Sequence, residues 1–213
     1  MNNQRLELVG KSVGAAILIA LGDFALLKLG NPIGPVLFAL GLLGVCYLGQ
    51  SLFTGKCGFF IQDKMKFSDL MIILVVNLLA GYLVGVVFSL IDPEVAAAAS
   101  SKMATWEVSM PFFIKSILCG VIMYIAVAMY KKGTPLGIIF GVPLFIFCGF
   151  QHCIANVITM GAGQGFSWSL LICILGNFFG SILMWYVSRD FLLEKKAVAK
   201  RGGKNGKKVS KKK

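Results

Sequence analysis

"GFQHCIAN", residues 149–156, places three polar side chains in the middle of a long apolar run. His152 is the only histidine among the 213 residues, with Gln151 before it and Asn156 four positions after it. In the hydrocarbon of a bilayer each unpaired polar group costs several kcal/mol, so such groups need partners or water. The stretch therefore predicts an internal hydrogen-bond network or a water-lined path through a membrane protein.

The composition around this stretch is that of a membrane protein. Hydrophobic residues make up 57% of the chain and charged residues 14%, whereas soluble domains average about 25% charged residues. Runs of about 20 apolar residues recur, and each is long enough to cross a hydrocarbon core of ~30 Å. We expect six spans, at about residues 12–29, 33–53, 68–91, 110–130, 136–160 and 166–188.

Basic residues are unevenly distributed between the loops. The N-terminus, the second and fourth loops and the C-terminal segment are rich in Lys and Arg, whereas the first, third and fifth loops offer only Lys28 and Lys102. Loops rich in Lys and Arg stay on the cytoplasmic side of a membrane. Both termini are therefore predicted to be cytoplasmic.

The C-terminal segment carries most of the net charge. Residues 189–213 hold 11 Lys and Arg and two acids, which supplies +9 of the total +12. A Gly-rich basic run cannot bury enough apolar surface to fold. We expect residues 1–190 to form the membrane domain and residues 191–213 a disordered cytoplasmic tail that contacts anionic lipid; nucleic-acid binding is not expected.

The six cysteines do not predict a metal site or a disulfide framework. They lie almost entirely within apolar segments, no pair has the CxxC spacing, and the chain has a single histidine. Structural zinc sites need Cys and His ligands at short spacing. We expect no metal, no cofactor and no disulfide framework.

The two halves of the chain carry comparable interruptions. The second span contains "GQSLFTG" (49–55) where the fifth contains the stretch around His152, and G-x-x-x-G pairs occur at Gly81/Gly85 and at Gly176/Gly180. Three spans per half reverse the direction of the second half, which is typical of inverted-repeat transporters with broken helices. The predicted fold is all-α: six transmembrane helices in two inverted three-helix repeats (about 1–92 and 93–190), with helices 2 and 5 broken.

Three motifs resemble those of the formate/nitrite transporter family: "SLFTG" (51–55), "GFQHCIAN" (149–156) and "LGNFFG" (175–180). The resemblance extends over residues 5–190. It implies an aquaporin-like protomer in a homopentamer, with one pore per protomer for a small monovalent anion such as formate, nitrite or hydrosulfide. It also implies a bacterial-type inner membrane.

The resemblance assigns roles to individual residues. It implies a pore centre at His152 and Thr54, with Gln151 and Gly120 beside them. It implies hydrophobic constrictions and basic vestibule residues at further positions. The outer constriction is Leu52, Phe53, Met123 and Phe145, the inner one is Leu42, and the vestibule residues are Arg5 and Lys102.

The chain departs from the family pattern near this centre. The family has acids where this chain has Gln151 and Ser51, and asparagines where it has Gly120 and Tyr82. The loss of two acids makes the pore surroundings less negative, and Gly120 removes a hydrogen-bond donor and leaves space. These departures concern the substrate more than the fold.

His152 has a clear physical use between two apolar constrictions. Its imidazole N–H can donate a hydrogen bond, or a proton, to an anion that has lost its hydration. Plain structural roles stay open: His152 bonding a backbone carbonyl, Thr54 satisfying its own helix end, and Asn156 and Asn177 joining helices. Asp23 is expected to form a pair near Lys28 and Asn31 at the external mouth.

Four functions remain to be weighed. An anion channel, for formate above all, fits the basic mouths and the single central donor. The alternative is an aquaporin-like channel for a small neutral solute or a protonated weak acid. An enzyme is not expected, because His152 has no second titrating partner, and a structural membrane protein would not need two matched polar interruptions.

Overall fold

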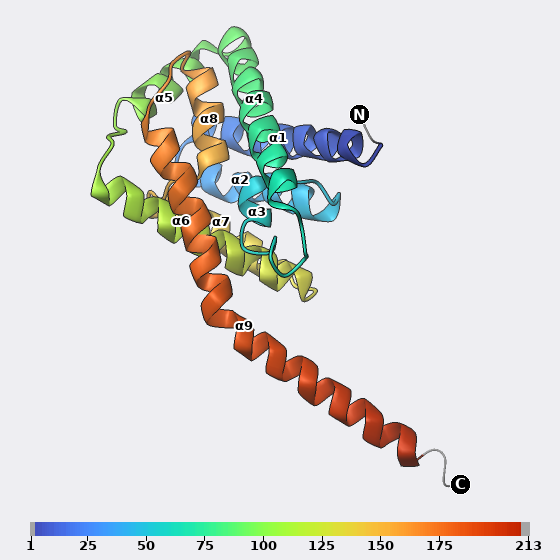
Figure 1. Ribbon diagram of the computed structural model, residues 1–213. Helices are drawn as coiled ribbons and strands as arrows, with labels where there is room; N and C mark the ends of the chain where they lie inside the picture. The colour runs from blue at the N-terminus through green and yellow to red at the C-terminus, as the bar shows by residue number, and fades with distance from the viewer. Residues whose placement is uncertain (1–2, 210–213) are drawn as a thin grey trace.

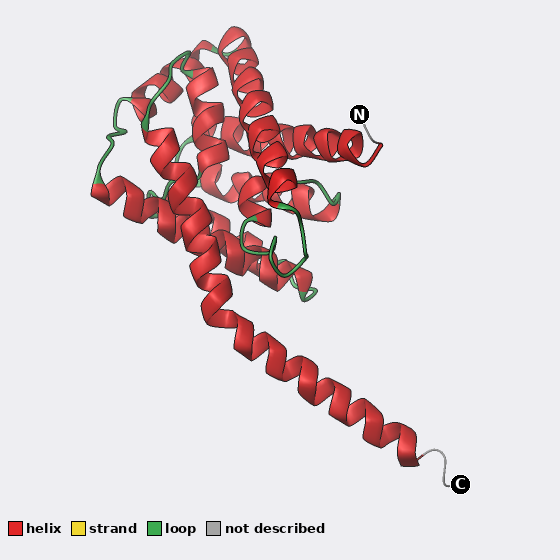
Figure 2. Cartoon of the chain, in the orientation of Figure 1, coloured by secondary structure: helices red, strands yellow, loops and turns green. Residues whose placement is uncertain are grey.

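The computed structural model describes the backbone of residues 3–209 and the side chains as far as Arg189; residues 1–2 and 210–213 lie outside the described part. Within it the chain is helical, with loops and no strand (Figure 2). The helices are α1 (Asn3–Leu29), α2 (Ile33–Tyr47), α3 (Phe53–Lys56), α4 (Phe67–Ile91), α5 (Pro93–Met103), α6 (Met110–Lys131), α7 (Leu136–Phe147), α8 (Cys153–Ala162) and α9 (Ser169–Val209), labelled in Figure 1.

Four helices are long and apolar enough to cross a membrane: α1, α4, α6 and the Ser169–Arg189 part of α9. Helices α2, α7 and α8 are apolar but shorter. The backbone of α9 continues as helix to Val209, where the sequence indicated disorder from residue 191. The residues around 194–200 are mainly Glu, Lys and Ala, which are good helix formers.

Helix α5 was missed in the sequence. Asp92 caps it, accepting hydrogen bonds from the backbone N–H groups of Glu94 (3.0 Å) and Val95 (3.2 Å), and Pro93 occupies its first position. An acidic cap followed by proline and an Ala-rich run is a helix-start signal. With 11 residues, α5 is too short to give the long apolar run that indicates a membrane span.

Two short segments separate pairs of apolar helices: residues 48–52 lie between α2 and α3, and residues 148–152 between α7 and α8. We call them the first and second interruptions. Each contains a glycine with positive φ, Gly49 (62°) and Gly149 (67°). The following residues, Gln50 and Phe150, each donate back to the helix at 2.8 Å. This left-handed glycine ending stops both helices in the same way.

The sequence suggested that the G-x-x-x-G pairs Gly81/Gly85 and Gly176/Gly180 are matching features of the two halves, but they do not occupy equivalent places. A Cβ on Gly85 would meet backbone atoms of α8, whereas a Cβ on Gly180 would meet the backbone of Ile117 on α6. The pairs thus bring different helices close together. The close approach of α4 to α8 holds α8 in the interior.

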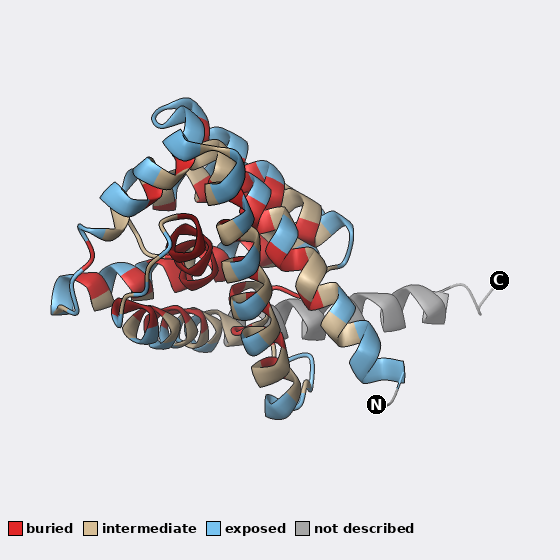
Figure 3. Cartoon of the chain, turned by 90° about the horizontal axis from the view of Figure 1, so that it is seen from above, coloured by how far each residue is buried: buried red, intermediate tan, exposed pale blue. Residues whose placement is uncertain are grey.

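Helix α8 is buried along its whole length. It packs against α4, α5, α1 and α9, and Figure 3 shows a buried helix enclosed by others whose outward faces are exposed. Those outward faces carry large apolar side chains, such as Leu40, Leu79, Leu83 and Leu175. A protein built in this way has its polar interior at α8 and its apolar surface outside, as a membrane environment requires.

Candidate functional site

The side chains of His152 and Thr54 meet in the interior. The Nε2 atom of His152 lies 2.8 Å from Oγ1 of Thr54, and the two residues are 98 positions apart in the sequence. His152 immediately precedes α8, and Thr54 is the second residue of α3. The contact therefore joins the starts of the two helices that follow the interruptions, and both side chains are buried.

A backbone hydrogen bond fixes the tautomer of His152. Its Nδ1 atom accepts from the N–H of Ala155 at 3.1 Å, so His152 caps α8. A neutral imidazole then carries its hydrogen on Nε2, and this hydrogen points to the hydroxyl of Thr54. The hydroxyl hydrogen of Thr54 is left as a donor.

Two asparagines hold the interruptions in place. Asn77 accepts from the N–H of Phe53 (2.8 Å) and donates to the carbonyl oxygens of Ser12 (2.7 Å) and Ser51 (3.1 Å). It thereby ties the first residue of α3 to both α1 and the first interruption. Asn77 was missed in the sequence.

Asn177 repeats this arrangement on the second interruption. It accepts from the N–H of Cys153 (2.8 Å) and donates to the carbonyl oxygens of Ser116 and Gln151, both at 2.8 Å. Asn77 and Asn177 each stand 24 residues after the first residue of the helix they hold. This equal spacing was the signal that could have found Asn77.

Gln151 and Asn156 bond to each other beside His152. The amide nitrogen of Asn156 donates to Oε1 of Gln151 at 3.0 Å, and the Gln151 amide nitrogen donates to the carbonyl of Gly149, also at 3.0 Å. This pair answers the question raised by the polar stretch. Its side chains satisfy each other and border a cavity.

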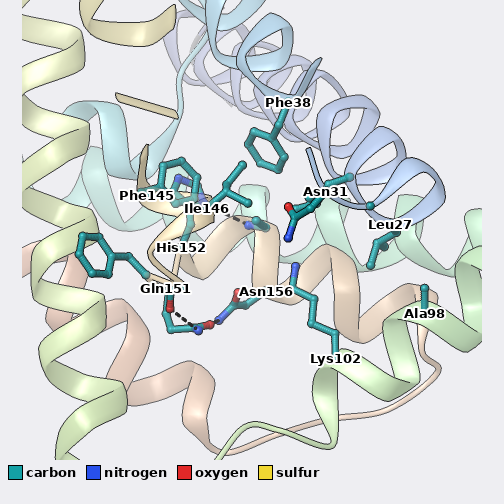
Figure 4. A pocket seen from close by; sticks show the side chains of 15 residues that line it. Leu27, Asn31, Phe38, Ala98, Lys102, Phe145, Ile146, Gln151, His152 and Asn156 are labelled. Atoms are coloured by element: carbon teal, nitrogen blue, oxygen red, sulfur yellow. Dashed lines mark hydrogen bonds between the residues drawn. The ribbon is translucent and has the colours of Figure 1, made fainter. Parts of the chain in front are cut away.

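The cavity beside His152 has a volume of about 320 Å³. We call it the His152 cavity. In Figure 4, Lys102 from α5, Asn156 from α8 and Asn31 point into it, with Phe38 and Phe145 on the apolar side. The ring of Phe145 stacks on the imidazole with a centroid separation of 5.8 Å. Phe145 and His152 therefore form a buried, ring-stacked part of the cavity wall.

Lys102 pairs with Asp23, and this corrects the expected pairing. The Nζ atom of Lys102 lies 3.7 Å from Oδ1 of Asp23, and Thr159 donates to the other carboxylate oxygen at 2.9 Å. Asp23 is completely buried. Lys28, its predicted neighbour, instead binds Asp92 (2.9 Å) and Glu94 (2.6 Å), because α5 brings these acids to the end of α1.

A second cavity of about 220 Å³ is lined by Lys56, and we call it the Lys56 cavity. Leu42 and Leu52 lie on its wall, so Leu52 shares a cavity with Leu42 and not with Phe145. No residue lines both cavities. Phe53 and Met123 are buried and line neither.

Two predicted site residues lie elsewhere. Arg5 lines a separate surface cavity with Lys66 and Asp69. A Cβ on Gly120 would meet the backbone of Asn177, so the absent side chain permits close contact of α6 with α9 and leaves no space. Among the residues whose side chains are described, no three His, Cys, Asp or Glu come together as metal ligands.

The sequence matches the model of the formate/nitrite transporter family over residues 2–189. The chain belongs to the formate/nitrite transporter family. It is accordingly a multi-pass membrane protein of a channel and transporter family, and the resemblance noted in its motifs is confirmed.

Relatives in this family include characterised and uncharacterised proteins. An uncharacterised transporter of Bacillus subtilis, YwcJ, is 28% identical over 204 residues, covering 80% of this chain and 76% of that protein. An uncharacterised transporter of Saccharomyces cerevisiae is 29% identical over 192 residues, but the match spans only 31% of it. The formate channel FocA of Haemophilus influenzae is 24% identical over 151 residues, 62% of this chain and 53% of that protein.

Solved structures of the family have the same fold. A channel described as an FNT family ion channel superposes with a TM-score of 0.66 at 23% identity, over 86% of this chain and 87% of that one. A pentameric formate channel with formate bound gives a TM-score of 0.70 at 15% identity, over 93% and 99%.

Proposed function

We propose that the protein is a membrane channel for a small monovalent anion of the formate type. The path runs from the His152 cavity, past His152 and Thr54, to the Lys56 cavity. The observation that carries this proposal is the Thr54–His152 hydrogen bond, because His152 lines one cavity while Leu52 and Gly55, close to Thr54 in the chain, line the other. An anion on this path would meet a central pair of hydrogen-bond donors, His152 and Thr54, between apolar walls.

The chemistry of this centre suits an anion without its full hydration shell. The hydroxyl of Thr54 is the first donor, and Nε2–H of His152 becomes the second when the anion displaces its bond to Thr54; α8 begins beside them. A helix N-terminus carries a partial positive charge that favours anions. Phe145 on one side, and Leu42 and Leu52 on the other, exclude bulk water, which strengthens these interactions.

The hydrogen-bonding role of His152 is favoured over proton donation. A second proton would have to sit on Nδ1, where it would face the N–H of Ala155. Loss of the proton on Nε2 would leave an imidazolate, so the neutral ring is a poor acid. We infer that His152 holds the anion by a hydrogen bond and keeps its own proton.

The membrane topology belongs to the same proposal. Helices α2–α3 and α7–α8 each form one broken span, which gives six spans in two inverted repeats, about 1–92 and 93–190. The lysine-rich loops place both termini in the cytoplasm of a bacterial-type inner membrane, with residues 191–213 as a basic segment at the lipid surface. The apolar outer faces and the pentameric formate channel support a homopentamer.

Flux into proteoliposomes tests the proposal. We expect formate, nitrite or hydrosulfide uptake to fall about 10- to 100-fold in His152→Ala, since a hydrogen bond to a charged group contributes about 1.5–3 kcal/mol. Cys153→Ala, a change at the next residue, is the matched control and should retain uptake. Equal uptake in His152→Ala and wild type would refute the central role of His152.

A second candidate is a channel for a small neutral solute or a protonated weak acid. The pairing of Lys102 with buried Asp23 favours it, because the carboxylate offsets the only cation of the His152 cavity within the described residues. In the same assay, uptake of neutral solutes without anion flux would select this function.

A further inference from the structure

The Lys56 cavity contains a cation that forms no ion pair among the described residues, although the carboxylate of Asp63 attracts it from a greater distance. Lys56 is half-buried, and among the described residues its ammonium takes part in no salt bridge. No side-chain hydrogen bond of Lys56 is present in that part of the chain either, whereas Lys28, Lys102 and Lys131 all donate to side chains. Asp63 is itself paired with Lys131, so the half-buried ammonium of Lys56 can still attract a counterion.

The neighbouring lysine shows the contrast. Lys131 also lines the cavity, but its Nζ atom binds Asp63 at 2.7 Å and lies 4.0 Å above the ring of Phe59. Its charge is therefore already satisfied within the protein. Among the residues with described side chains, no Asp or Glu lines the Lys56 cavity.

The remaining lining is suited to a small anion. Leu42, Val45 and Leu52 are apolar, and Tyr130 contributes a phenol to the lining. The volume of about 220 Å³ is several times the ~30 Å³ that one water occupies in the liquid. A carboxylate-sized anion with a few waters fits this volume.

We propose that the Lys56 cavity is an anion-binding site, separate from the His152–Thr54 centre, in which the ammonium of Lys56 holds a small monovalent anion such as formate. The site makes the two ends of the path unequal, because Asp23 offsets the cation at the other end. The identity of the anion rests on the proposed function, whereas the charge preference of the cavity does not.

A native cysteine allows a test that does not depend on flux. Cys46 lines the Lys56 cavity, and Cys148, the exposed cysteine of the described part, is removed by Cys148→Ser. Cys46 is then labelled with two methanethiosulfonates of similar size, one anionic and one cationic. We expect the anionic reagent to react about tenfold faster, because a nearby unit charge acts with opposite sign on the two reagents.

Substitutions of Lys56 decide whether this residue is the cause. In Lys56→Gln the rate ratio should fall to about one, and Lys56→Arg should restore the preference. Lys66→Gln, which removes an exposed lysine outside this cavity, should leave the ratio unchanged. Formate should protect Cys46 from labelling in the wild type and not in Lys56→Gln.

The outcomes separate this inference from the proposed function. Equal rates for both reagents in the wild type, a ratio unaffected by Lys56→Gln, or no reaction of Cys46 at all would overturn the anion site, even with normal flux. Lys56-dependent labelling and formate protection in a protein without flux would support the site and refute the channel.

Discussion

The first and second interruptions share one backbone arrangement and differ in their side chains. Phe53 and Cys153, each the first residue of the following helix, are 100 positions apart, as are Asn77 and Asn177, which hold them. At the same separation, Leu52 stands where the other half has His152, and Lys56 where it has Asn156. The two interruptions therefore share their backbone arrangement, but the imidazole side chain occurs in the second one alone.

This comparison explains how polar groups are accommodated in an apolar interior. The backbone groups freed by each interruption are satisfied by one asparagine amide, which leaves His152 and Thr54 to bond to each other. The two cavities differ in the same way, since His152 lines one of them and Leu52 lines the other. In the channel that we propose, the asparagines hold the backbone and a different pair, His152 and Thr54, contacts the solute.

The largest effect is expected at the two asparagines. Asn77→Ala and Asn177→Ala each remove three buried hydrogen bonds, so each should lower the free energy of unfolding by about 2–4 kcal/mol. Thermal unfolding in detergent measures it. Because the two networks match, the two losses should agree within about 1 kcal/mol; a neutral substitution at either site would show that the halves are not held alike.

An exchange of the central residues tests whether the chemistry belongs to one side. His152→Leu should keep the fold, because leucine already occupies the equivalent position, and should reduce anion flux about 10- to 100-fold. Restoration requires Leu52→His with Ile154→Thr and Thr54→Ile, which rebuilds the pair in the other half. Recovered flux would show that the two interruptions are interchangeable. If flux does not recover, the two interruptions differ in function because the cavities around them differ.

The charge difference between the cavities gives a smaller effect. Asp23→Asn removes the carboxylate beside Lys102, so anion flux at low ionic strength should rise about two- to fivefold and return towards the wild-type value in high salt. Flux measured across a salt series checks this. The double variant Asp23→Asn/Lys102→Gln should lose this increase in flux. If the increase persists, it does not depend on the charge of Lys102.

The smallest effect is expected at the salt bridge that holds α5. Lys28 lies 2.9 Å from Asp92 and lowers the pKa of that carboxyl below its usual range. The stabilisation is therefore complete above the unfolded-state pKa of about 3.9 and is lost as pH falls through the lower folded-state value.

The matched variant for this prediction is Asp92→Asn, which can still cap α5 but cannot form the ion pair. The wild type should have the higher melting temperature at neutral pH, and the difference should vanish in strong acid. A difference that is independent of pH would assign the effect to the cap.

The sequence predicted the membrane class and the two interruptions, because these follow from apolar length and from local motifs. It also singled out His152 and Thr54, whose side chains the fold brings into contact. It did not predict the partners of charged residues. Asp23 was assigned to Lys28, which is close in the sequence, but α5 presents Lys102 to it. Gly120 was taken to leave space, and helix packing fills that space. Arg5 was placed near a vestibule and lies in a different cavity.

By itself the sequence determined where the chain is apolar, where it is interrupted and which polar residues accompany each interruption, since these depend on transfer free energy and on the glycine endings at Gly49 and Gly149. Only the tertiary structure decided which polar atoms meet. Thr54 and His152 are 98 positions apart, and their 2.8 Å contact exists because close helix contacts at glycines bring α3 and α8 together in the interior. A hydrogen bond depends on tenths of an ångström, and such distances are set by packing between distant segments.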